Sequence, residues 1–178
     1  IYPGTKKKVF VSKDYLWCLP IQGKICNVKP SKVSSILKNK EIGNLIKVLD
    51  LKFGVDYSDP KNYSKLPYDA FISLNDADKD GHHIGGLELN FFQEYFPSLL
   101  KIGYVQCMES PIIKIEYKGK VTMYYDQKEG EDMAKKYPGC TVRYLKGLGS
   151  NSDKFIDEFF GRRIVQWVWD EKTNDNME

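Results

Sequence analysis

Two stretches of the chain carry apolar residues at the spacing of an amphipathic helix. In residues 31–54 these positions are Val33, Ile36, Leu37, Ile42, Leu45, Ile46 and Leu49. Their spacing predicts one helical unit that is interrupted near Asn39 and ends at Gly54. In the second stretch the residues on one helical face are Ile84, Leu87, Phe91 and Tyr95. Pro97 ends this pattern, because proline breaks a helix when it stands inside one.

Short runs rich in β-branched and aromatic residues alternate with these helices and predict strands. They cover residues 69–74, 104–108, 111–117, 121–125 and 141–145. Lys118 and Gly119 form a turn between two of these runs, which predicts a hairpin. Further helices are expected over residues 127–137 and 153–160. Helices that alternate with strands predict an α/β fold, in which ligands gather outside the carboxyl ends of the strands.

The composition fits a globular intracellular domain. With 178 residues, of which 42% are hydrophobic, the chain can fill one core. The net charge of +3 is only mildly basic, so affinity for nucleic acid has to come from local clusters of charge. No apolar run reaches the length of a membrane span. The cysteines, which are Cys18, Cys26, Cys107 and Cys140, show no C-x-x-C spacing, and this favours reduced thiols over a zinc site.

The segment LNDADKDGHHIGG, residues 74–86, concentrates negative charge and invites comparison with a calcium loop. The first half of an EF-hand pattern is matched by Asp76, Asp78, Asp80 and Gly81. The second half fails, because the twelfth position is Leu87 and the nearest acid, Glu88, comes one place late. The flank also disagrees, since a short apolar run precedes the acids where an EF-hand has a helix. A calcium-binding or purely structural module remains open only as an alternative.

Carboxylates between a strand and a helix suit Mg²⁺ better than Ca²⁺ in an α/β domain. Mg²⁺ accepts one or two carboxylates, keeps several waters and completes its shell with phosphate oxygens. A second loop, residues 146–152 (KGLGSNS), is consistent with a phosphate-containing ligand. Its Gly147 and Gly149 permit close approach of backbone N–H groups to an anion, and Lys146 adds positive charge. Together the two loops predict a site for Mg²⁺ and a phosphate ester.

Four motifs in the same order resemble type IIA DNA topoisomerases of the eukaryotic or large-DNA-virus type. They are LPIQGKICNV (19–28), ILKNKEIGNLIKVLDLKFGVDYSD (36–59), ISLNDADKDGHHIGGLELNFFQEYFPSLLK (72–101) and VRYLKGLGSNS (142–152). The resemblance implies a TOPRIM fold, which is Rossmann-like, with a mostly parallel sheet flanked by helices and an added strand hairpin. Residues 1–18 would then be the upstream edge of the domain, 19–160 the TOPRIM domain, and 161–178 the start of a linker toward a winged-helix domain.

The resemblance also implies roles for individual residues. Asp76, Asp78 and Asp80 would form the catalytic acidic triad that binds metal. Asp76 and Asp78 would be the direct Mg²⁺ ligands, and Asp80 would act through a bound water or at an alternate metal position. Mn²⁺ or Ca²⁺ would be able to substitute in binding. The residues implied to lie along the DNA backbone are Lys24, Lys146, Gly147, Gly149 and His83. For His83, orientation of the acidic loop is an equally good interpretation. Gly23 would likewise permit close approach of the backbone.

The sequence departs from the pattern of this family at several positions. Gln22 replaces an arginine, which removes one cationic contact to DNA. His82 stands where the family has serine, and no role is assigned to it. The glutamate of the TOPRIM fold is expected upstream of Leu19 and has no counterpart there. The nucleophilic tyrosine is expected in the winged-helix domain, so none of the 12 tyrosines is assigned as nucleophile.

These expectations describe a piece of a larger enzyme. The parent would be an ATP-hydrolysing DNA topoisomerase that acts on double-stranded DNA as a homodimer, with ATP bound at a domain outside this chain. It would work inside the cell, in the nucleus, or in the host cytoplasm or nucleus if viral. The chain alone is expected to be inactive. Within enzymes, a TOPRIM nuclease or primase is the main alternative, and the motifs around Lys24 and Lys146 favour the topoisomerase.

Overall fold

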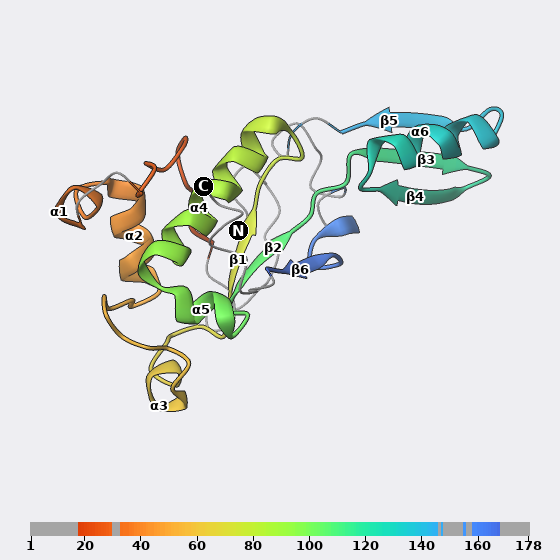
Figure 1. The fold of residues 1–178 in the computed structure, drawn as a ribbon. Helices are drawn as coiled ribbons and strands as arrows, with labels where there is room; N and C mark the ends of the chain where they lie inside the picture. The colour runs from red at the N-terminus through yellow and green to blue at the C-terminus, as the bar shows by residue number, and fades with distance from the viewer. Residues whose placement is uncertain (1–17, 30–32, 146, 148–154, 156–157, 168–178) are drawn as a thin grey trace.

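A computed structural model describes residues 18–29, 33–145, 147, 155 and 158–167. This part of the chain contains both helices and strands (Figure 1). In order they are α1 (Val33–Ile36), α2 (Lys40–Val48), α3 (Pro60–Tyr63), β1 (Phe71–Leu74), α4 (Lys79–Tyr95), α5 (Pro97–Lys101), β2 (Val105–Met108), β3 (Ile113–Tyr117), β4 (Lys120–Tyr124), α6 (Gln127–Lys136), β5 (Thr141–Tyr144) and β6 (Ile164–Gln166). The predicted mixed α/β fold is therefore confirmed.

The described strands form two small sheets. In the first, β1 pairs with β2 in parallel and β2 pairs with β6 antiparallel. In the second, β3 lies between β4 and β5 and is antiparallel to both. The predicted mostly parallel sheet is not confirmed, because β1–β2 is the only parallel pair among the described strands. The predicted hairpin is confirmed: β3 and β4 are joined at Lys118 and Gly119, which both have positive φ angles.

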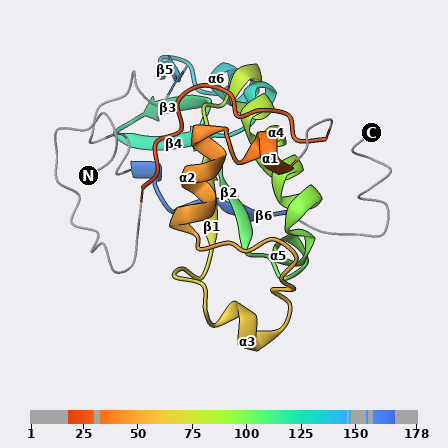
Figure 2. The same ribbon diagram turned by 90° about the vertical axis from the view of Figure 1, so that its left-hand side faces the viewer.

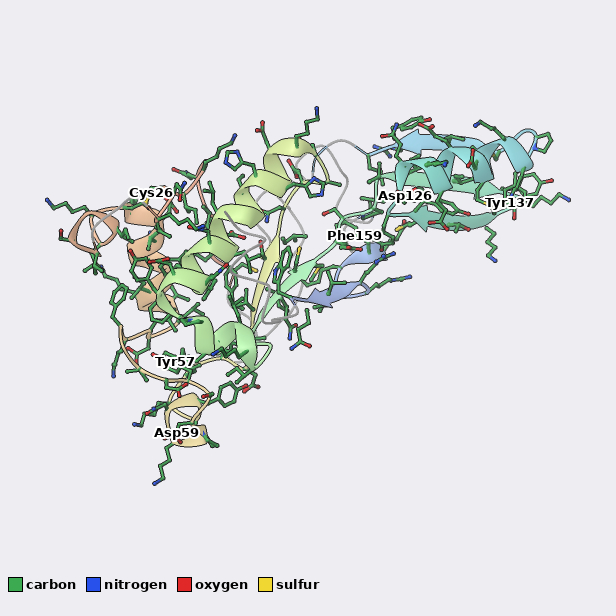
Figure 3. The ribbon with its side chains drawn as sticks, in the orientation of Figure 1. Cys26, Tyr57, Asp59, Asp126, Tyr137 and Phe159 are labelled. Carbon is green, nitrogen blue, oxygen red and sulfur yellow. The ribbon has the colours of Figure 1, made fainter. Side chains whose placement is uncertain are left out.

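Most of the described helices begin at a capping side chain that the sequence supplies. The predicted interruption near Asn39 is the start of α2, where the Asn39 side chain accepts a hydrogen bond from the backbone N–H of Ile42. Asp59 begins α3 and Asp126 begins α6 in the same way (Figure 3). The helix α3 lies in a segment predicted to be a polar loop, and Pro60 after the Asp59 cap is the signal for it. The strand β6 was also not predicted, and it lies within the range assigned as the start of a linker.

The main hydrophobic core lies between the β1–β2 sheet and the helices α2, α4 and α5. Figures 1 and 2 place α2 and α4 on the same side of this sheet. Phe91 and Phe92 of α4 are fully buried, and the ring of Phe92 lies 5.1 Å from that of Phe71 in β1. Ile42 of α2 and Leu99 of α5 belong to the same cluster. Because the C-terminal half of α4 packs into this core, the helix is held against β1, and its N-terminus lies at the end of that strand.

The second sheet has its own small core, with α6 packed on β3 and β4. Ile113, Ile115 and Tyr124 are buried there, and Tyr137 at the end of α6 stacks on Tyr117 (Figure 3). Figure 1 shows this sheet beyond the carboxyl ends of β1 and β2. Within the described part of the chain, none of the helices combines the length and apolar character needed to cross a bilayer.

Truncation of a core aromatic residue of α4 tests this account of the fold. We expect Phe92→Ala to lower the free energy of unfolding by about 3–5 kcal/mol, because the ring is fully buried and its removal leaves a cavity. Urea denaturation measures the change. Leu37→Ala is the control, because Leu37 is 50% exposed and its truncation should cost less than about 0.5 kcal/mol. Equal losses in the two variants would contradict the assignment of the core.

Candidate functional site

The predicted acidic residues lie where strand β1 turns into helix α4. Asp76 and Asp78 are in the connecting loop, and Asp80 is in the first turn of the helix. Asp78 is the N-cap of α4: its Oδ1 accepts a 2.8 Å hydrogen bond from the backbone N–H of Gly81. A carboxylate at this position is stabilised by the partial positive charge of the helix N-terminus. The negative charge of Asp78 is thus part of the local structure as well as a candidate ligand.

Gly81 lets the first turn of α4 lie directly against the loop. A Cβ atom at position 81 would be 2.0 Å from the carbonyl oxygen of Asp76, a distance that no side chain can occupy. In the sequence, Gly81 stands where a calcium loop has its turn glycine. The structure instead shows that a glycine is required by the contact between the helix and the Asp76 backbone.

Lys24 connects the first described segment of the chain to the acidic turn of α4. Its ammonium Nζ is 2.9 Å from Oδ1 of Asp80 and 3.2 Å from Nδ1 of His83. The hydrogen bond and charge of Lys24 lower the pKa of the Asp80 carboxyl. Both partners of the ion pair are well exposed, so solvent screens it and it adds little stability. Lys24, Asp80 and His83 were each predicted as site residues, and the structure brings them into contact.

The glycine loop also reaches the acids, although β1 and β5 belong to different sheets. A Cβ atom on Gly147 would lie 3.1 Å from Oδ2 of Asp76, so Gly147 lies directly beside that carboxylate. The segment between β2 and β3 contributes a further contact, because the Ser110 hydroxyl donates a 2.9 Å hydrogen bond to the carbonyl of Asn75. Lys146 and Gly149, the other predicted residues of this loop, lie outside the described residues. Gly23 and Gln22 are exposed, and Gly23 has a φ of +74°.

A buried polar cluster beneath the loop was not predicted from the sequence. Glu88 of α4 is 4% exposed, and its Oε2 accepts hydrogen bonds from the hydroxyl of Ser73 and the amide of Asn75. Burial raises the pKa of the Glu88 carboxyl, and the two hydrogen bonds partly offset this effect. The helical spacing could have indicated that Glu88 is buried, because it lies four residues after Ile84 and three before Phe91, on the apolar face of the helix.

The arrangement of donors can be compared with the needs of a metal ion. Among the described residues, no group of three or more histidine, cysteine, aspartate or glutamate side chains is placed to hold a metal. Mg²⁺ does not need such a group, because one or two carboxylates with water and phosphate oxygens suffice. Asp76 and Asp78 meet that requirement in ligand type, since a carboxylate has two oxygens and the cap uses Oδ1 of Asp78. Asp80, by contrast, is paired with Lys24.

Comparison with curated proteins identifies relatives that are named DNA topoisomerase 2. The chain is 31% identical over 192 residues to DNA topoisomerase 2 of Invertebrate iridescent virus 6, a match that covers 99% of this chain and 17% of the viral protein. It is 33% identical to human DNA topoisomerase 2-alpha, with 93% of this chain and 11% of that protein covered. It is 33% identical to DNA topoisomerase 2-beta of Gallus gallus, with 84% of this chain and 9% of that protein covered. The chain thus spans less than a fifth of the length of each of these relatives.

A solved structure gives the same result. The topoisomerase II DNA-binding, cleavage and re-ligation domain of Plasmodium falciparum superposes with a TM-score of 0.77 at 27% identity. This match covers 88% of the present chain and 22% of the other. No family model matches the sequence.

Two glycines of α4 provide a matched test of the contact between helix and loop. We expect Gly81→Ala to lower the free energy of unfolding by about 1–3 kcal/mol, because the new methyl group collides with the Asp76 backbone. Gly86→Ala should raise it by about 0.5–1 kcal/mol, because position 86 is open and alanine favours a helix. Thermal or urea unfolding measures both. Stabilisation by Gly81→Ala would show that the loop does not lie against this turn.

Proposed function

Because these similarities make the chain a relative of a segment of DNA topoisomerase 2, we propose that it is the TOPRIM portion of a type IIA topoisomerase. In that role it supplies Mg²⁺-binding carboxylates and contacts to the DNA backbone for reversible cleavage and religation of double-stranded DNA. The parent enzyme couples this reaction to ATP-dependent strand passage as a homodimer, together with its ATPase and winged-helix domains.

The proposal rests on one observation above all: two motifs that are far apart in the sequence lie next to each other in the structure. Asp76 follows β1, and Gly147 follows β5 more than 70 residues later, yet Gly147 lies against the Asp76 carboxylate. The unit β1–α4–β2 has the parallel pairing of a Rossmann-like fold, whose ligands bind outside the carboxyl ends of the strands. The acids lie at that end of β1, as a TOPRIM site requires.

The residues present fit a Mg²⁺ site of low ligand number. Asp76 and Asp78 would bind the ion, which when bound would neutralise negative charge on a DNA phosphate and on the departing oxygen. The Gly81 N–H fixes the carboxylate of Asp78. Lys24 contacts Asp80 and His83 of the first turns of α4, so a phosphate that approaches this face would meet an ammonium and an imidazole. Lys146 is proposed as a second backbone contact.

The structure gives reasons against an EF-hand-like calcium module. The acids follow strand β1, whereas an EF-hand loop follows a helix. Glu88, the acid nearest to the twelfth position, is buried and hydrogen-bonded to Ser73 and Asn75 beneath the loop. It therefore points away from the position of a bidentate calcium ligand. A TOPRIM nuclease or primase would share the acids, but it would lack the motifs that place Lys24 and Gly147 beside them.

Removal of the proposed direct ligand in the complete enzyme tests the function. We expect Asp76→Ala to reduce DNA cleavage and relaxation by about 100-fold or more, since Lewis-acid stabilisation contributes several kcal/mol to the transition state. ATP hydrolysis should persist. Asp132→Ala is the control, because Asp132 lies on α6 in an exposed pair with Lys135. Near-normal relaxation of supercoiled plasmid by Asp76→Ala would reject the metal role.

The isolated chain tests how the site depends on the rest of the enzyme. We expect it to bind Mg²⁺ only weakly, with a Kd on the order of millimolar, because few carboxylates are available and Asp80 is paired with Lys24. Calorimetry with Mg²⁺ and Ca²⁺ measures this affinity, and an EF-hand would instead prefer Ca²⁺ by orders of magnitude. Incubated with supercoiled plasmid and Mg²⁺, the chain should neither cleave nor relax the DNA. Covalent protein–DNA adducts that Asp76→Ala abolishes would place a nucleophile within these residues.

A further inference from the structure

We propose that Glu88 is a positioning residue, which fixes the orientation of the loop that carries Asp76 and Asp78. It acts through Ser73 and Asn75 and does not touch the metal itself. The inference rests on the proposed function, because it concerns how the Mg²⁺-binding loop is shaped.

The geometry that carries this inference is a closed cluster of three side chains. Oε2 of Glu88 accepts hydrogen bonds from the Ser73 hydroxyl and, at 3.5 Å, from Nδ2 of Asn75. The same Asn75 Nδ2 also donates a 2.7 Å hydrogen bond to Oγ of Ser73. Ser73 is the third residue of β1, Asn75 is the first residue after the strand, and Glu88 is in the middle of α4. The cluster thus connects the strand, the loop and the helix at one point.

Asn75 is the residue through which the cluster reaches the acids. It directly precedes Asp76, so the plane of the peptide between them sets the direction in which the Asp76 side chain leaves the backbone. Its amide is bonded inward to Glu88 and Ser73, and its carbonyl accepts the hydrogen bond from Ser110. A Cβ atom on Gly85 would be 3.4 Å from Nδ2 of Asn75, so this face of α4 just accommodates the amide. Asn75 is therefore fixed on both its side chain and its backbone.

The choice of glutamate is unfavourable for packing alone. Position 88 lies on the apolar face of α4, where an aliphatic side chain would fill the space without loss of hydration. Burial of a carboxyl group costs free energy that hydrogen bonds recover only in part, and buried polar groups are often replaced by apolar ones without loss of stability. The carboxyl group is explained by what it binds, because an aliphatic residue could not accept hydrogen bonds from Ser73 and Asn75.

A comparison of two substitutions at position 88 separates positioning from packing. Glu88→Leu removes the acceptor and keeps the volume, and Glu88→Gln keeps one acceptor oxygen. We expect Glu88→Leu to weaken Mn²⁺ binding by the isolated chain by about 10-fold or more, the effect typical of residues that orient metal ligands. Its free energy of unfolding should fall by no more than about 1–3 kcal/mol, because the Ser73 hydroxyl and the Asn75 amide lose an acceptor while the volume of the side chain is kept. Glu88→Gln should restore most of the affinity. Electron paramagnetic resonance of unbound Mn²⁺ gives the affinity without any activity assay.

The Asp76→Ala variant, titrated in parallel, distinguishes failure of this inference from failure of the proposed function. Loss of Mn²⁺ binding in Asp76→Ala but wild-type affinity in Glu88→Leu would overturn the positioning role and leave the metal site intact. Wild-type affinity in Asp76→Ala would overturn the metal site and the inference with it. If Glu88→Leu does not fold, Ser73→Ala decides by the same criterion, since it removes the hydroxyl from the cluster and adds no volume. Weakened Mn²⁺ binding by the folded Ser73→Ala variant supports the proposal, and wild-type affinity rejects it, whatever the change in stability.

Discussion

The contact between the first turn of α4 and the backbone of Asp76 is the constraint on which the site depends. It exists because Gly81 has no side chain, and a Cβ atom there would be 2.0 Å from the Asp76 carbonyl. With the helix this close, the Gly81 N–H donates a hydrogen bond to the carboxylate of Asp78, which caps the helix. The aromatic core beneath α4 keeps the helix in this position, since Phe92 packs on Phe71 of the preceding strand.

Much of the local structure could be predicted from the sequence, because it depends on interactions over a few residues. The interruption at Asn39 coincides with a helix cap, and the turn at Lys118 and Gly119 joins two strands as expected. The pairing of strands was less predictable. The predicted sheet was single and mostly parallel, but β5 pairs with β3 in a separate antiparallel sheet. β6 pairs with β2 although it lies more than 50 residues later in the chain. Such pairings are set by tertiary contacts that no local pattern records.

The candidate site was predictable to a similar degree. The acids and the glycine loop stand out as motifs, and the structure brings Gly147 to Asp76 even though the predicted single sheet is replaced by two. The partners of these residues were not predictable in the same way. Lys24 meets Asp80 across 56 positions of sequence, and the Glu88 cluster joins a strand to a helix. These contacts depend on the packing of α4 against β1, so they appear only once the fold is known.

The structure also shows how groups of the protein offset the charges of aspartates at alternate positions in the sequence. Carboxylates at alternate positions repel one another, and each raises the pKa of its neighbours unless a positive group is near. Here the charge is divided among different partners: Asp78 bonds to a helix N-terminus, and Asp80 bonds to Lys24, which lowers the pKa of Asp80. Repulsion at the loop is thereby reduced by groups of the protein itself. A metal ion would then bind to a loop whose shape is already set. The free energy of binding would therefore not be reduced by the entropy cost of ordering the loop.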